Sequence, residues 1–214
     1  MISEPDVTFT DYGLAIECAL FTYLIHRQGD LHRPLRNSFA LFFGSVGTAA
    51  LTGGTVHGFF LDASTIGYAI LWPSTLIAIG VSALAGWVIG ATLLFPVRVA
   101  RGVSILAAAG FIIYCIAVLS ISQTFLLAVV NYLPAAIFLS IAFAIVYARQ
   151  GQRPVLVGLA GMALTFVAAG VQQTGIALHP VYFNHNALYH LIQAVALLMI
   201  FWSARSFVEG RART

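Results

Sequence analysis

Charged side chains are scarce in this chain of 214 residues, and lysine is absent altogether. Charged residues make up 8% of the sequence and hydrophobic residues 60%, whereas a typical soluble domain carries roughly 25% charged residues. Ten basic and seven acidic side chains cannot give a soluble domain of this size its polar surface. The composition therefore excludes a soluble enzyme and a nucleic-acid-binding protein. The absence of lysine also excludes a lysine Schiff base, and with it a retinal protein of the usual kind.

Cysteine is equally rare. Cys18 and Cys115 both lie in apolar stretches, where cysteine behaves as a small hydrophobic side chain. The sequence therefore gives no sign of a disulfide framework. Residues 1–11 are acidic and lack the positive start and short apolar core of a secretory signal, so we expect the first apolar run to be retained.

Long apolar runs, in contrast, are abundant. A transmembrane helix needs about 20 apolar residues, and seven such runs follow one another along the chain, separated by short polar breaks. Because backbone groups in lipid must be hydrogen-bonded within their own segment, each run is predicted to be a helix. We therefore predict an all-α, polytopic membrane bundle that forms a single domain over residues 1–214. The runs cover about residues 10–24, 38–61, 65–95, 103–119, 125–148, 155–178 and 186–203.

The arginines orient this bundle. With seven crossings, all ten arginines fall on one side of the membrane, and Glu4, Asp6 and Asp62 fall on the other. The positive-inside rule then predicts an outside N-terminus and a cytoplasmic C-terminus. We therefore expect a multi-pass protein of the plasma (inner) membrane, surrounded by the lipid bilayer.

Ionisable side chains in and beside the runs gather towards the predicted outer side. Such groups are costly in a bilayer and usually line a cavity, pair with one another or bind a metal. Asp11 is expected to cap the first helix, and His179, before Pro180, is expected to be a loop residue. The group comprises His57, His179, His185 and His190, together with the carboxyl groups of Asp11, Glu17 and Asp62.

The start of the seventh run carries a polar face. Asn186, His190 and Gln193 are spaced four and three residues apart, so they project from one side of a helix. Asn184 is a suitable N-cap. His185 lies about 140° away if it is helical, unless the backbone at the helix entrance turns it inward.

A zinc ion held by imidazoles, with one position open to water, suits these residue types best. The candidate ligands are His57, His185 and His190. The metal would lower the pKa of its water towards 7, and Asp62 is the candidate that orients this water or takes its proton. Gly53, one turn before His57, would allow a neighbouring helix close to the imidazole. The other candidate polar contacts are Gln193, which could hold a ligand ring, Asn186 and Glu17.

Two other functions remain open at this stage. One is a haem-binding electron carrier that uses His57 and a histidine of the seventh run as axial ligands. The other is a non-catalytic receptor, transporter or proton-linked binding protein that uses the polar cavity together with Glu17.

The arrangement resembles the CREST superfamily of seven-span membrane proteins, which comprises alkaline ceramidases, progestin and adipoQ receptors and haemolysin III-like proteins. The resemblance rests on His57 late in the second run and on Asn186-Ala-Leu-Tyr-His190, which corresponds to an HxxxH motif entering the seventh run. It implies zinc-dependent hydrolysis of an amide or ester bond in a lipid-like substrate, with Asp62 as the aspartate of the zinc site. The acids Asp11 and Glu17 are similar to the calcium-binding acidic start of the ceramidase branch.

Two departures from the pattern affect this expectation. Asn186 stands where the motif has its first histidine, so His185 would have to replace it from the adjacent position. Gly53 stands where a serine precedes the second-run histidine. Both departures make lost or altered activity an open alternative.

Overall fold

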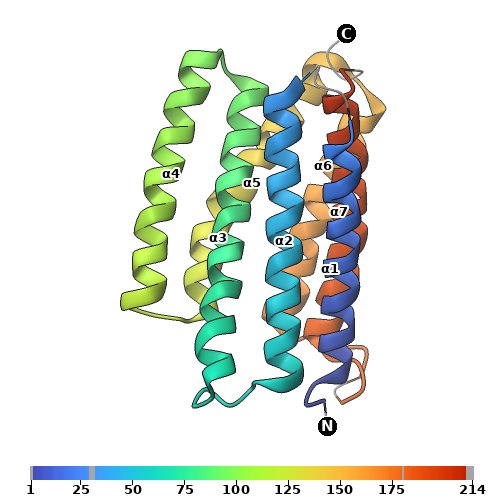
Figure 1. Cartoon of the computed structure of the whole chain (residues 1–214). Helices are drawn as coiled ribbons and strands as arrows, with labels where there is room; N and C mark the ends of the chain where they lie inside the picture. Colours follow the sequence, from blue (N-terminus) through green and yellow to red (C-terminus); the bar gives the residue numbers. More distant parts are fainter. Residues whose placement is uncertain (1, 29–31, 180, 211–214) are drawn as a thin grey trace.

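The computed structural model describes residues 2–28, 32–179 and 181–210, and within these ranges seven helices run alternately in opposite directions (Figure 1). The predicted all-α class is confirmed. Six of the helices, α2 to α7, are long and apolar enough to cross a membrane. The helices are α1 (Pro5–His26), α2 (Arg33–Phe59), α3 (Ile66–Leu94), α4 (Val97–Ser120), α5 (Phe125–Gln150), α6 (Arg153–Thr174) and α7 (His185–Val208).

Some of the prolines and glycines mark helix ends, whereas Pro73 and Pro134 lie inside α3 and α5. Pro5 and Pro154 lie in the first turns of α1 and α6, where the missing N–H costs no helical hydrogen bond. Gly151 and Gly175 end α5 and α6 with φ of 66° and 72°, a left-handed conformation that glycine adopts without strain. The predicted N-cap of α7 is confirmed, because the Asn184 side chain accepts hydrogen bonds from the N–H groups of the next turn.

The first helix begins earlier than its apolar run. The run was expected to start at Thr10, with Asp11 as a cap, but α1 begins at Pro5, and Asp11 lies well inside it. The extra turn is held because Val7 and Thr8 are fully buried. The expected role of Asp11 as an N-cap is therefore wrong, and the carboxyl group lies in the bundle interior instead.

The two ends of the bundle differ in charge. The N-terminus and the C-terminus lie at opposite ends in Figure 1, and the helices alternate in direction between them. Arg27, Arg98, Arg149 and Arg205 all lie near helix termini at the end where the chain finishes. We refer to this as the arginine end, and to the other as the N-terminal end.

The arginine end is packed solid by aromatic side chains. Phe21 stacks on Phe201 with ring centroids 4.2 Å apart, and Phe43 packs edge-on against both rings. Phe143 and Phe207 extend the same cluster. Aromatic packing of this kind fills the core between α1, α2 and α7 at this end.

Glycine brings α1 close to α2. A Cβ atom on Gly54 would lie 2.6 Å from Cβ of Asp11, which no real contact tolerates. At Gly53, the position expected from the sequence to give a close approach, the nearest atom would be Thr75 Cγ2 at 3.4 Å. The neighbouring glycine, Gly54, therefore sets the close approach, and it fixes α1 so that Asp11 faces inward.

Helix α4 lies at the edge of the bundle, beside α3 (Figure 1). A small second core joins them, in which the buried Tyr114 hydroxyl donates a hydrogen bond of 2.8 Å to the Leu76 carbonyl. Only Ala100, Tyr114 and Val118 of α4 are buried. The remaining six helices surround the interior, and they supply the residues of the site described next.

Candidate functional site

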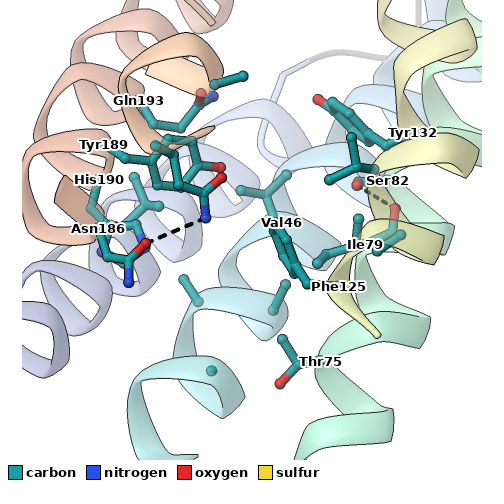
Figure 2. A pocket seen from close by; sticks show the side chains of 18 of the residues that line it. Val46, Thr75, Ile79, Ser82, Phe125, Tyr132, Asn186, Tyr189, His190 and Gln193 are labelled. Atoms are coloured by element: carbon teal, nitrogen blue, oxygen red, sulfur yellow. Dashed lines mark hydrogen bonds between the residues drawn. The ribbon is translucent and has the colours of Figure 1, made fainter. Parts of the chain in front are cut away.

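A cavity of about 420 Å³ lies between the six helices other than α4. One polar part of its lining comes from α7, where Asn186, Tyr189, His190 and Gln193 follow one another over two turns (Figure 2). Further polar lining groups come from the other five helices: Asp11, His57, Thr75, Ser82, Tyr132, Thr165, Gln172 and Gln173. Its other walls are largely apolar, with Val46, Ile79 and Phe125 among the residues across from α7. The cavity therefore combines an apolar interior with a few polar groups, which is the usual composition of a small-molecule site.

The central polar contact joins α1 to α7. Nε2 of His190 lies 3.2 Å from Oδ1 of Asp11, and both side chains are nearly inaccessible. Nδ1 of His190 lies 3.1 Å from the Thr10 hydroxyl. Both ring nitrogens of His190 are thus occupied by α1, a helix 180 residues earlier in the chain.

The hydrogen-bond directions place a proton inside this pair. The Thr10 hydroxyl lies 2.8 Å from the Asp6 carbonyl and donates to it, so its oxygen is free to accept from Nδ1–H of His190. One proton then lies between Nε2 of His190 and the carboxyl group of Asp11. The pair can hold this proton on either partner, as a neutral couple or as an ion pair, without rearranging the helices.

A second histidine–carboxyl pair joins α1 to α2. Oε2 of Glu4 lies within hydrogen-bonding distance of Nδ1 of His57, and both side chains are partly exposed. His57 lines the cavity, whereas Glu4 does not. The backbone N–H of Ser3 also donates to the Gly58 carbonyl, at 3.0 Å. The start of the chain is therefore tied to the end of α2.

A further contact ties the same segment to α7. Oδ2 of Asp6 accepts a hydrogen bond of 2.9 Å from the backbone N–H of Asn184, the N-cap of α7. The first two turns of α1 thus hold α2 on one side and α7 on the other. They determine the shape of the cavity at the N-terminal end.

Deeper in the cavity, one buried acceptor lacks a partner. Gln193 is 6% exposed, and its Nε2 lies 3.4 Å from the Thr165 hydroxyl. Thr165 in turn donates to the Gly161 carbonyl, so the Thr165 oxygen accepts from Nε2 of Gln193. Within the described residues, Oε1 of Gln193 has no hydrogen-bond partner. Leaving a buried polar atom unpaired costs about 1–3 kcal/mol, so a ligand atom at this position would be favourable.

The structure brings together only part of the group predicted from the sequence. His57, Asn186, His190 and Gln193 line one cavity. His179 is a loop residue as predicted, because its ring accepts hydrogen bonds from the backbone N–H groups of the α6–α7 connection. Polar residues of the second and seventh helices therefore line one cavity, as the sequence predicted.

Three other predicted site residues lie outside this cavity. His185 is the first residue of α7 and is half-buried. Asp62 is exposed in the α2–α3 connection, where the backbone N–H of Ser64 donates to it at 2.8 Å and lowers the pKa of the carboxyl group. Glu17 lies on another part of α1, and its buried Oε2 has no partner within the described residues. None of the three lines the cavity.

The geometry does not fit a zinc ion held by His57, His185 and His190. Both ring nitrogens of His190 face side chains of α1, and His185 lies outside the cavity. Within the ranges that the structure describes, no group of three or more histidine, cysteine, aspartate or glutamate side chains is arranged to hold a metal ion. Zinc at these residues and calcium near Asp11 and Glu17 stay predictions, which metal analysis of the purified protein would test.

Sequence reasoning missed the role of the α1 carboxyl groups. Glu4 and Asp11 are seven residues apart, which places them on one face of a helix. That spacing was an available signal once the helix was known to begin at Pro5. No local pattern, however, shows that Asp11 faces His190 and Glu4 faces His57.

Comparison with known proteins shows the family of this chain. Residues 7–208 match the DUF6962 family, a family of unknown function, and the chain belongs to it. The match spans all seven helices from the first buried residue of α1 to the last residue of α7. No curated protein and no solved structure matches the chain.

Proposed function

We propose that this member of the DUF6962 family is a membrane protein that binds a small amphipathic molecule in the cavity between its helices. The observation that carries the proposal is the cavity itself, about 420 Å³ lined by six helices. Ligand sites in proteins are typically about 300–1,000 Å³ with apolar walls and a few convergent polar groups. This cavity has both properties.

The arrangement of polar groups supports binding in preference to hydrolysis. The His190 ring and the Asp11 carboxyl group contact each other, so neither side chain is available as a free base or nucleophile. Asp62, the candidate water-activating carboxylate, is exposed and held by the backbone of its own loop. A histidine–carboxyl pair beside an apolar cavity is suited to proton-linked binding or transport, since gain or loss of one proton would change the net charge of the pair while a ligand is present.

We further propose that all seven helices span the membrane, with the arginine end in the cytoplasm. The charge asymmetry supports this orientation, because arginine is retained on the cytoplasmic side of membrane proteins. Helix α1 is less apolar than the others and is not among the six clear spans. Its acidic groups Asp6 and Asp11 are paired with α7, which reduces the cost of placing them beside lipid.

Identification of co-purifying molecules tests the binding function. The detergent-purified protein is denatured and extracted, and the released small molecules are quantified by mass spectrometry. We expect one species at a near-stoichiometric level in the wild type. Ala169→Leu, which fills the cavity from α6, is expected to deplete this species.

Ala109→Leu provides the matched control, because Ala109 is exposed on the outer helix α4. This substitution adds the same atoms outside the cavity, so the Ala109→Leu protein is expected to retain the co-purifying molecule. Equal levels in the two leucine variants, or no enriched species in the wild type, would contradict binding in this cavity.

Elemental analysis of the same samples separates binding from the zinc-dependent hydrolase predicted from the sequence. The binding function predicts no stoichiometric zinc. Near-equimolar zinc in the wild type that is lost in His190→Ala would instead support the hydrolase. An absorption spectrum of the purified protein tests the haem alternative in the same way.

A further inference from the structure

We infer that the cavity selects an amphipathic molecule whose polar group donates a hydrogen bond and carries no charge, such as an alcohol or a primary amide. This inference rests on the proposed function and names its ligand class. The anchor that we assign is Oε1 of Gln193. It is a cavity-lining acceptor that the protein itself leaves without a partner.

The orientation of Gln193 makes it an acceptor for the ligand. Its Nε2 donates to Thr165, whose hydroxyl hydrogen is already directed to the Gly161 carbonyl. With the Thr165 hydroxyl hydrogen directed to Gly161, Oε1 is the amide atom that has no partner within the described residues. The side chain extends from α7 at the cavity wall in Figure 2, and it is more than nine-tenths buried. Only a ligand or a water molecule can reach it with a donor.

The charges of the lining disfavour an anionic head group. No arginine is found among the described residues that line the cavity. The basic groups of the lining are His57 and His190, and each is paired with a carboxyl group of α1. An anion would therefore have no free cationic partner in a site of low dielectric, where an unpaired charge is expensive.

The other lining residues determine the shape of the ligand that fits the cavity. Val46 and His57 lie eleven residues apart on α2 and both line the cavity, so it extends over about 16 Å along that helix at 1.5 Å per residue. Val46, Ile79 and Phe125 face the polar α7 wall, with the hydroxyl groups of Thr75, Ser82 and Tyr132 between these apolar side chains (Figure 2). An elongated apolar chain fits this space, with its polar group directed at α7.

A matched set of medium-chain alkyl compounds tests the inference. Decanol and decanamide are uncharged and donate hydrogen bonds, decyl methyl ether only accepts them, and decanoate is an anion. Each is added at the same concentration to the purified protein, and thermal unfolding is followed. A compound that binds the folded state raises the melting temperature, so we expect decanol or decanamide to raise it and the ether and decanoate to have little effect.

Variants at Gln193 link this selectivity to the proposed anchor. Gln193→Leu is expected to weaken binding of the preferred compound about tenfold, the loss that corresponds to one hydrogen bond of about 1.4 kcal/mol. Gln193→Met, which keeps the length of the side chain, serves the same purpose if the leucine variant does not fold. Ser206→Ala is the control, because Ser206 is also a buried, unpartnered polar group of α7 but does not line the cavity.

The outcomes separate this inference from the function on which it rests. In one outcome, decanoate or the ether raises the melting temperature more than both donors do, and this effect is lost in Ala169→Leu. That result would overturn the inferred ligand class but keep the cavity as the binding site. Unchanged affinity for the donor compounds in both Gln193 variants would overturn Gln193 as the anchor. Stabilisation that survives Ala169→Leu would place binding outside the cavity and overturn both.

Discussion

Replacement of Gly54 by alanine is expected to destabilise the protein, although alanine is the better helix former. Alanine in place of a helical glycine is favourable by about 0.5–1 kcal/mol where space allows. At Gly54 the added methyl group would lie 2.6 Å from Cβ of Asp11, and both atoms belong to rigid helical positions. Inserting a methyl group into such a contact costs about 1–3 kcal/mol. We therefore expect a net loss of about 1 kcal/mol, or about 2–4 °C in melting temperature for a chain of this size.

Gly53 provides the matched control, since it is the adjacent residue of the same helix. Its added methyl group would meet Thr75 Cγ2 at 3.4 Å and Asp11 Oδ2 at 3.9 Å, which are ordinary contact distances. Gly53→Ala is therefore expected to leave stability unchanged or to raise it slightly.

Thermal unfolding of the two variants in the same detergent measures the difference. The Gly54→Ala protein should also bind the co-purifying molecule less well, because movement of α1 displaces Asp11 from His190. A Gly54→Ala protein as stable as Gly53→Ala would refute the close packing of α1 on α2 from which both expectations derive.

Three further predictions concern the polar contacts and the topology. Asp11→Leu leaves the buried His190 ring without its partner, so we expect a loss of about 1–3 kcal/mol in unfolding free energy, whereas an unchanged melting temperature would contradict the pairing. Tyr114→Phe removes the 2.8 Å hydrogen bond between α4 and α3 and is expected to cost about 1 kcal/mol; no measurable cost would mean that α4 is held without it. In a background lacking both native cysteines, Ser64→Cys is expected to react with an impermeant thiol reagent from outside intact cells, and Gln152→Cys only after the cells are opened. Labelling in the reverse order would contradict the proposed orientation.

Much of the candidate site could be anticipated from the sequence, but its central contact could not. Helical spacing predicted that Asn186, His190 and Gln193 share one face, and all three line the cavity. Spacing also predicted the N-cap Asn184, which the structure confirms. These successes depend on local geometry, which repeats every few residues and can be read from a short window.

The errors concern residues whose role depends on another helix. Asp11 was expected to cap the first helix, because an acid at the edge of an apolar run usually does so, yet it is buried against His190. Gly53 was expected to provide the close approach that Gly54 provides. Neither outcome follows from the run itself, because each is set by the rotation of α1 about its axis.

By itself, the sequence determined the class of this protein. The low charge and the long apolar runs predict a bundle of helices, six of which are long and apolar enough to cross a membrane, because lipid imposes its requirements on each segment separately. The tertiary structure alone decided which polar groups meet. Asp11 and His190 are 179 residues apart, and their contact exists because glycines let α1 pack closely on α2 while α7 closes the other side. That packing also leaves the cavity between the six helices, which Asp11 and His190 both line.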